Sequence, residues 1–153
     1  MIKAKIALAA ERLLTDPQTG GTTLVNVLEA VKPVTPFPWA FQQMIFWVAF
    51  DRELSDQPIA TFKFRLSFND QELSAIPFTV QFPEKHIITN LVFNLSGLVV
   101  PSAGRVEFRI LNNDQSVFAE YLLPIEQPEF KVSQPPLPSH PTNVVQPASQ
   151  SSG

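Results

Sequence analysis

The sequence predicts an all-β protein: an antiparallel sandwich of about eight strands, followed by a disordered C-terminal tail. Three observations support this fold class. Apolar and polar residues alternate with a period of two through most of residues 1–126, as they do in strands with one buried face. Turn-forming residues interrupt the alternation roughly every 8–15 residues. After residue 126 the composition becomes proline-rich and nearly uncharged.

The first strand is expected at the N-terminus, where Lys3 and Lys5 share one face. Its other face carries Ile2, Ala4, Ile6 and Leu8. The good helix formers of IALAAERLL, residues 6–14, leave a short helix open as the alternative. After the turn-rich TDPQTGG, the β-branched run TTLVNVLEAV predicts a second strand. The nearly continuous apolar run QQMIFWVAF predicts a central strand covered on both faces.

A hairpin is expected over residues 60–82. In ATFKFRLSF the alternation places four residues on the buried face: Phe62, Phe64, Leu66 and Phe68. The turn NDQE follows, because Asn and Asp tolerate turn geometry and bond their own backbone. SAIPFTVQF then returns with a second buried row: Ile76, Phe78, Val80 and Phe82.

Three further strands are expected between residues 91 and 125. The first buries Leu91, Phe93 and Leu95, and PSAG then turns the chain, with Gly104 expected to take a positive φ. The second buries Val106, Phe108 and Ile110 and points Glu107 and Arg109 outward. The third, SVFAEYLLPI, buries Ala119, Tyr121 and Leu123, and Pro124 suits a strand end or a sheet edge.

The chain divides into a sandwich domain, residues 1–126, and a tail, residues 127–153. The tail holds six of the 15 prolines and only two charged residues, so it cannot bury enough apolar surface to offset its ordering entropy. Its PPLPSHP stretch contains PxxP spacing, which aromatic grooves can bind. A solvated tail and a docking motif are both open interpretations.

Composition excludes several classes of function. The net charge is −3, without the basic excess that nucleic-acid or membrane-surface binding requires. The chain has no cysteine, so thiol chemistry and disulfides are excluded. Its apolar N-terminal run is too short for a secretory signal, and no run is long enough to cross a membrane as a helix. A cytoplasmic protein is therefore expected.

Three blocks resemble a small family of bacterial proteins of uncharacterised function with an immunoglobulin-like sandwich fold. They are AKIALAAE, GGTTLVNVLEAV and FNLSGLVVPSAGRVEFRIL, in matching order and spacing. The sequence departs from that family in carrying Val106 where an aromatic residue is usual, and in its proline-rich tail. The resemblance implies an immunoglobulin-like fold and no particular activity.

The chain offers little material for catalysis. Its two histidines, His86 and His140, lie in a predicted loop and in the tail, where neither is expected to be held in a catalytic geometry. One histidine without cysteine makes no zinc site. The alternative is a sugar or calcium site in the end loops. Calcium binding is favoured if the loops around Asp51, Asp70 and Asp114 meet at one end of the fold. We therefore expect no enzyme, no cofactor and no metal.

The segment VKPVTPFPWAF, residues 31–41, is the strongest candidate for function. Its prolines stiffen it, and Phe37, Trp39 and Phe41 project from it. These aromatic residues either cap the core or form a contact surface for a protein. The sequence therefore predicts a noncatalytic protein-interaction or scaffold module, whose partner is another protein or a second copy of the chain. A ligand-binding sandwich is the alternative.

Overall fold

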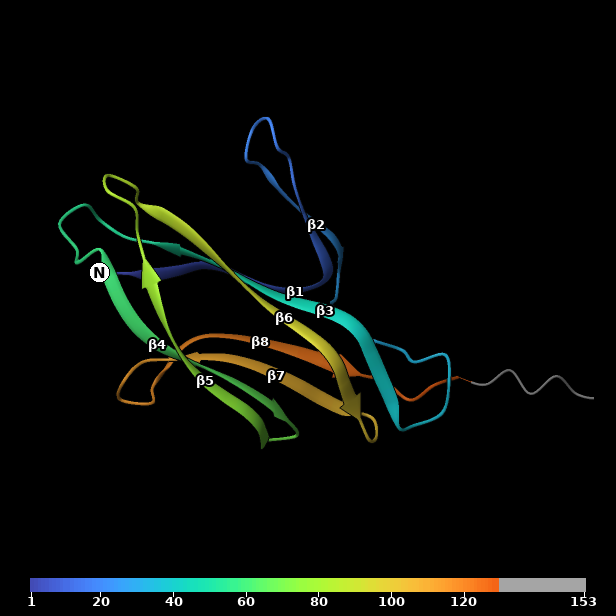
Figure 1. The fold of residues 1–153 in the computed structure, drawn as a ribbon. Coiled ribbons are helices and arrows are strands. Elements are labelled where there is room, and N and C mark those ends of the chain that lie inside the picture. The colour runs from blue at the N-terminus through green and yellow to red at the C-terminus, as the bar shows by residue number, and fades with distance from the viewer. Residues whose placement is uncertain (130–153) are drawn as a thin grey trace, which may run out of the picture.

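The computed structural model describes residues 1–129, which form eight strands and, within that range, no helix. The strands are β1 (Lys3–Thr15), β2 (Thr22–Val27), β3 (Trp39–Asp51), β4 (Ile59–Phe68), β5 (Gln71–Gln81), β6 (Ile88–Val100), β7 (Gly104–Leu111) and β8 (Val117–Ile125). They form two antiparallel sheets, ordered β2-β1-β3-β6 and β5-β4-β7-β8 (Figure 1). The prediction of an eight-stranded antiparallel sandwich is confirmed. Residues 1–129 also contain no helix long enough to span a membrane.

The strand pairing is that of an immunoglobulin-like sandwich. The β3 strand lies between β1 and β6 in one sheet, and β7 lies between β4 and β8 in the other. These are the neighbours of strands A, B and E and of strands C, F and G in immunoglobulin domains. Beside β4, β5 takes the place of an added C′ strand. The β2 strand is an addition that pairs only with β1.

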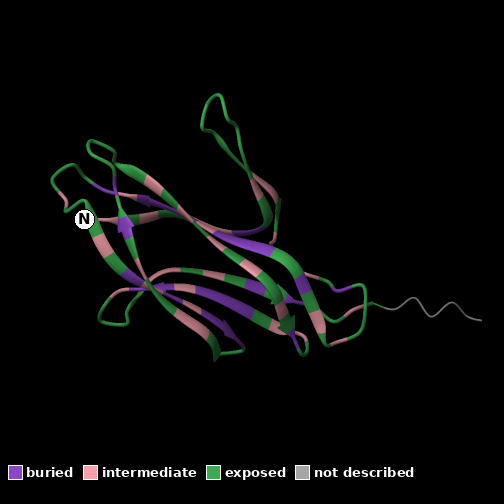
Figure 2. Cartoon of the chain, viewed as in Figure 1, coloured by how far each residue is buried: buried purple, intermediate pink, exposed green. Residues whose placement is uncertain are grey.

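Stacked phenylalanine rings fill the space between the sheets. Phe46 of β3 lies 5.7 Å from Phe64 of β4 and 5.0 Å from Phe108 of β7, between ring centroids. Phe64 in turn stacks on Phe93 of β6 at 4.3 Å. Buried residues follow the inner faces of both sheets (Figure 2). The buried rows expected in β4 and β7 are confirmed, with Phe64 and Phe108 at 1% and 0% exposure.

Three details of the early and edge strands differ from the sequence analysis. The N-terminal segment is a strand, as favoured, but it continues to Thr15. A register shift between Ala4 and Ile6 turns Ile6 outward, to 43% exposure, so the row expected there is interrupted. In β5, Val80 is buried but Ile76 is 51% exposed, because β5 is an edge strand that the opposite sheet covers only in part.

Gly104 is required by close approach and not by a positive φ. The described glycines with positive φ are Gly20 and Gly97. A Cβ atom at position 104 would lie 2.4 Å from Oδ1 of Asn69, which accepts a hydrogen bond from the Arg105 amide at 2.9 Å. The expectation for Gly104 is therefore wrong, although the turn itself is present.

Gly97 marks a change of face in β6. Leu91, Phe93 and Leu95 pack on the core at alternate positions, and beyond Gly97 the residues that do so are Leu98 and Val100. Gly97 has φ 69°, a left-handed conformation that side chains other than glycine rarely adopt. The sheet bends at this point, and the first part of β3 follows β6 toward the second sheet (Figure 1).

Glu107 faces outward on β7, as expected, yet its side chain is completely buried. Arg105 and Arg109, two positions away on the same face, cover it with Nη2–Oε1 and Nη1–Oε2 distances of 2.9 and 2.8 Å. Burial alone would raise the pKa of Glu107, but the hydrogen bond from Arg105 and the charge of Arg109 outweigh it, and the pKa lies below its usual value. Simple alternation could not show this burial.

Replacing Phe108 tests the core. We expect Phe108→Ala to lower the free energy of unfolding by about 3–5 kcal/mol, because it leaves a cavity among the stacked rings. Ile76→Ala, in the exposed part of β5, is the control and is expected to cost less than about 1 kcal/mol. Urea denaturation measures both, and equal effects would contradict the description of the core.

Glu107 predicts a pH dependence of stability. Because its pKa is lower in the folded chain than in the unfolded one, its charge stabilises the fold above the ordinary Glu pKa of about 4.3, and this stabilisation is lost as the pH falls further. Glu107→Gln should therefore cost about 1.5–3 kcal/mol at neutral pH. The difference from the unmodified protein should shrink below about pH 4. Exposed Glu84→Gln is the control, and a difference independent of pH would refute the assignment.

Candidate functional site

The sheet that contains β3 divides into two branches. The β1 strand pairs with β3 only from Lys3↔Asp51 to Ala10↔Ile45. Beyond Ala10, β1 pairs with β2 alone, and the resulting two-stranded arm projects from the sandwich (Figure 1). The bend at Gly97 carries the first part of β3 in a different direction. The two branches therefore leave an opening between them.

The opening exposes an unpaired strand edge. Residues 39–44 of β3 pair with β6 on one side, and within residues 1–129 no backbone hydrogen bond reaches them from the other side. Six residues of strand give an edge about 20 Å long. Along it, every second residue presents its N–H and C=O groups toward the opening. Natural proteins usually cover such an edge, because it can pair with another chain.

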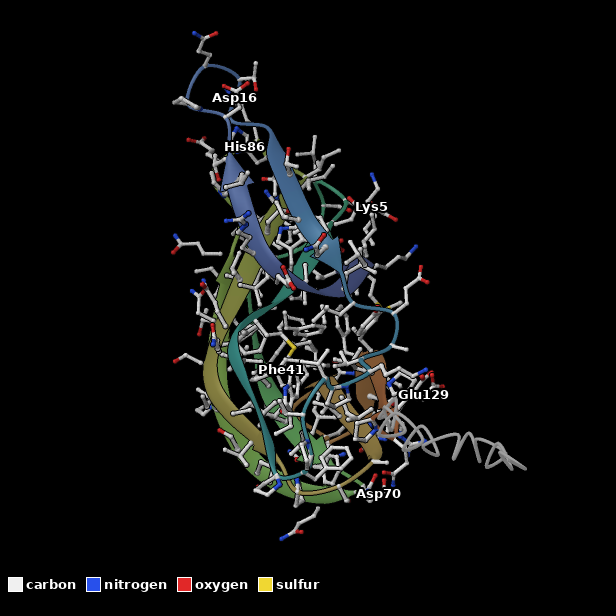
Figure 3. All side chains as sticks on the ribbon, turned by 90° about the vertical axis from the view of Figure 1, so that its right-hand side faces the viewer. Lys5, Asp16, Phe41, Asp70, His86 and Glu129 are labelled. Carbon is white, nitrogen blue, oxygen red and sulfur yellow. The ribbon has the colours of Figure 1, made fainter. Side chains whose placement is uncertain are left out.

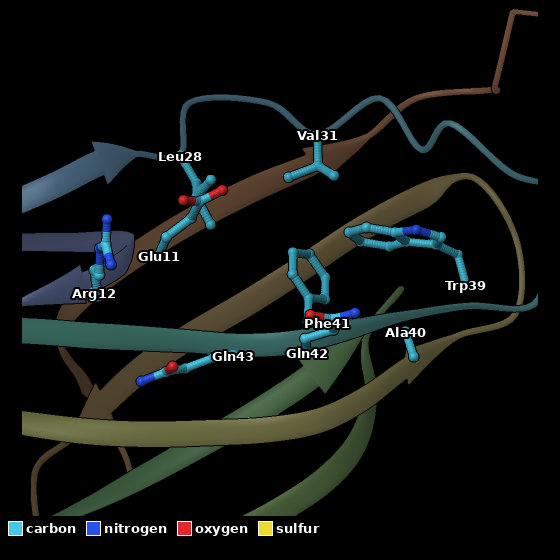
Figure 4. Close-up of a pocket in the computed structure, with 9 residues that line it drawn as sticks. All are labelled: Glu11, Arg12, Leu28, Val31, Trp39, Ala40, Phe41, Gln42 and Gln43. Carbon is cyan, nitrogen blue, oxygen red and sulfur yellow. The ribbon is translucent and has the colours of Figure 1, made fainter.

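A groove of about 610 Å³ follows this edge (Figure 4). Five consecutive β3 residues line it, which means that the strand edge itself forms one wall: Trp39, Ala40, Phe41, Gln42 and Gln43. Leu28 and Val31 line the opposite side, and Glu11 and Arg12 of β1 lie near the fork. The apolar side chains of Leu28, Val31, Trp39 and Phe41 all pack against the core.

The wall formed by Leu28 and Val31 is fixed by backbone and side-chain hydrogen bonds. The Leu28 amide donates to the Ala9 carbonyl at 2.9 Å, and the Tyr121 hydroxyl donates to the Leu28 carbonyl at 2.6 Å. Val31 forms a parallel bridge with Ile125 of β8. This segment therefore links the edges of the two sheets, and contacts within the chain hold this wall of the groove in place.

Phe37, Trp39 and Phe41 all take part in the packing of the core, but to different extents. Phe41 is buried, at 5% exposure, and its ring meets Trp39 at 4.6 Å between centroids. Phe37 and Trp39 are half-buried and pack on the core. Trp39 and Phe41 belong to β3 and pair with Val100 and Leu98, so this strand begins inside the proline-rich segment. The half-buried ring of Trp39 therefore covers part of the core and also lines the groove.

Two charged residues at the fork face opposite ways. Glu11 accepts a hydrogen bond from the Asn26 side chain at 2.7 Å, within the arm. Arg12 is exposed, and its side chain makes no ion pair or hydrogen bond within the described part of the chain. Neighbouring strand residues point to opposite faces, so Arg12 and Glu11 lie on opposite sides of the sheet.

The end-loop carboxylates do not meet. Asp51 and Asp114 lie at the end of the sandwich that carries the 52–58 and 112–116 loops, and Asp70 lies at the other end, opposite His86 (Figure 3). Asp114 is held by Ser116, and Asp56 is bonded to the N-terminal amine. Within residues 1–129 no three acidic or histidine side chains are placed to share a metal. The loops of Asp51, Asp70 and Asp114, which a calcium site would need at one end of the fold, are therefore not together within residues 1–129.

Of the two histidines, only His86 lies within the described residues. His86 is exposed in the loop between β5 and β6, where its carbonyl accepts a hydrogen bond from Nε of Arg52 at 3.0 Å. Its place is that of an ordinary loop residue. His140, the PPLPSHP stretch and the tail from residue 130 onward lie outside the described residues.

Comparisons with known proteins add little to this description. No family model matches the chain, and no curated protein matches its sequence. Among solved structures, the chain is similar to an immunoglobulin-like protein from Pseudomonas aeruginosa. The TM-score is 0.40 and the identity 9%, over 82% of this chain and 97% of the other. The fold described above rests on the strand pairing of the chain itself.

The sequence analysis missed most of the groove. Leu28, Val31 and Arg12 carry no motif, and their proximity to β3 depends on pairings between distant segments. One signal was present: the charged residues Glu11 and Arg12 end the apolar run before the turn at residue 16, so the last part of β1 does not lie on the core. That signal indicates a projecting arm but not an open edge beside it.

Replacing the two aromatic residues separates their roles. Phe41→Ala should cost about 3–5 kcal/mol of unfolding free energy, because the side chain is buried. Trp39→Ala should cost less, about 1–3 kcal/mol, because part of its ring already faces the groove. Thermal and urea denaturation measure both. A larger loss from Trp39→Ala than from Phe41→Ala would contradict the view that part of the Trp39 ring faces the groove.

Proposed function

We propose that this protein is a noncatalytic interaction module that binds an extended segment of a partner protein along the open edge of β3. The observation that carries the proposal is the combination of an unpaired six-residue strand edge with a preformed groove beside it. A segment bound there would add a strand to the sheet. Its backbone would supply the hydrogen bonds, and its side chains would fill the apolar part of the groove.

The chemistry of the edge favours a polypeptide over other ligands. Unpaired N–H and C=O groups at alternate positions match an extended backbone, which offers the same groups with the same spacing. A calcium ion would need several converging carboxylate oxygens, whereas Glu11 is the one acidic residue that lines the groove, and its carboxylate already accepts a hydrogen bond from Asn26. A sugar offers no row of N–H and C=O groups with the spacing of the strand edge. Trp is also among the residues that most often anchor protein interfaces.

The remaining expectations form part of this proposal. Within residues 1–129, His86 is the one histidine and stands in an exposed loop, which supports a role without acid–base catalysis. The net charge of −3 supports a partner other than nucleic acid or membrane. A cytoplasmic location and membership of the bacterial family that the sequence resembles belong to the same proposal.

The test uses a neutral probe, a capped octapeptide of alternating valine and glutamine. We expect saturable binding to the full chain, with slowed amide hydrogen exchange at residues 39–44. N-methylation of all valines or of all glutamines blocks opposite edges of the peptide strand, so one of the two methylated peptides should lose binding. Equal binding of both methylated peptides would rule out pairing through the backbone.

Side-chain variants complete the test. Trp39→Ala should weaken probe binding about tenfold or more, while Val99→Ala, an exposed apolar residue of β6 outside the groove, should leave it unchanged. Denaturation curves of both variants exclude unfolding as the cause. The contrary result is a dimer of the chain that binds no peptide and that dissociates when Trp39 is replaced by alanine. The edge is then a self-association surface, and the proposal fails.

A further inference from the structure

The two faces of the groove differ in chemistry. A strand added beside β3 would continue the sheet, and its side chains would alternate between the core side and the outer side. On the core side it would meet Leu28, Val31, Trp39 and Phe41. Arg12 belongs to the outer side, because Ala10, two residues before it, pairs with the outward-facing Ile45.

The charges at the fork favour an anion on the outer side. Arg12 is the cation that lines the groove, and within residues 1–129 no acidic side chain pairs with it. Glu11 also lines the groove and keeps its charge, but it lies on the opposite side of the strand from Arg12, where its carboxylate accepts a hydrogen bond from Asn26. The other basic residue near the groove, Lys32, is already paired with Glu129 at 2.8 Å. Arg12 is therefore the charge available to a ligand.

We infer that the segment recognised by this groove alternates apolar and acidic residues, with the apolar side chains against Trp39 and Phe41 and an acidic side chain against Arg12. This inference rests on the proposed function and names the chemistry of its ligand. It runs against the overall electrostatics of the protein, because a chain with a net charge of −3 attracts basic peptides in general. A preference for acidic peptides would therefore come from Arg12 beside the groove and not from the net charge of the chain.

Three capped octapeptides test the inference: valine alternating with glutamate, with lysine and with glutamine. At low salt we expect the glutamate peptide to bind up to about fivefold more tightly than the glutamine peptide, the range of an exposed ion pair, and the lysine peptide to bind most weakly. The preference should diminish at high salt. Arg12→Glu should reverse the order of the charged peptides.

Lys5→Glu is the matched control, because it makes the same change of charge at an exposed β1 position that does not line the groove (Figure 3). It should keep the preference for glutamate. If the glutamine peptide binds but Arg12→Glu leaves the order of the charged peptides unchanged, the inference is wrong and the proposed function stands. If no peptide binds, both fail.

Discussion

The β3 strand pairs with β6 over nearly its whole length but with β1 over only its second half. The arm, the groove and the open strand edge all depend on this difference in the length of the two pairings. A strand inside a sheet normally has both edges occupied, so the point where β1 leaves β3 creates an opening with backbone groups on its wall. The cause lies in two places. Gly97 allows β6 and β3 to bend toward the second sheet, and β2 gives the rest of β1 another partner. The arm, the groove and the open edge are consequences of one divided sheet.

The aromatic core stabilises the sandwich even though one of its sheets is divided. Phe46, Phe64, Phe93 and Phe108 stack between the two sheets. Aromatic rings bury large areas and interlock through preferred stacking geometries, so they fix the relation of the two sheets without help from the edges. Beside the groove, Trp39 and Phe41 extend the same apolar interior to the surface. The proposed binding surface is therefore an accessible margin of the core.

The outer faces of the two sheets have different chemistry. On the β5-β4-β7-β8 sheet, Arg105 and Arg109 cover the buried Glu107, and Arg109 also contacts Glu120. Charges engaged with one another are less available to a partner, and they discourage pairing with other sheets. On the other sheet the cation beside the groove, Arg12, has no such partner within the described residues. This contrast supports the assignment of recognition to the β3 side of the sandwich.

The sequence by itself determined the fold class, the hairpin of β4 and β5, and the buried rows of β4 and β7, because a period of two directly encodes which side of a strand is buried. It also pointed to Trp39 and Phe41, through their size and their setting among prolines. Only the tertiary structure decided that these residues belong to a strand, that Glu107 is buried and that Gly104 serves close packing. It alone placed Leu28, Val31 and Arg12 around one groove. Alternation describes each strand separately, whereas the length of a pairing, the bend of a sheet and an unoccupied edge depend on residues far apart in the chain.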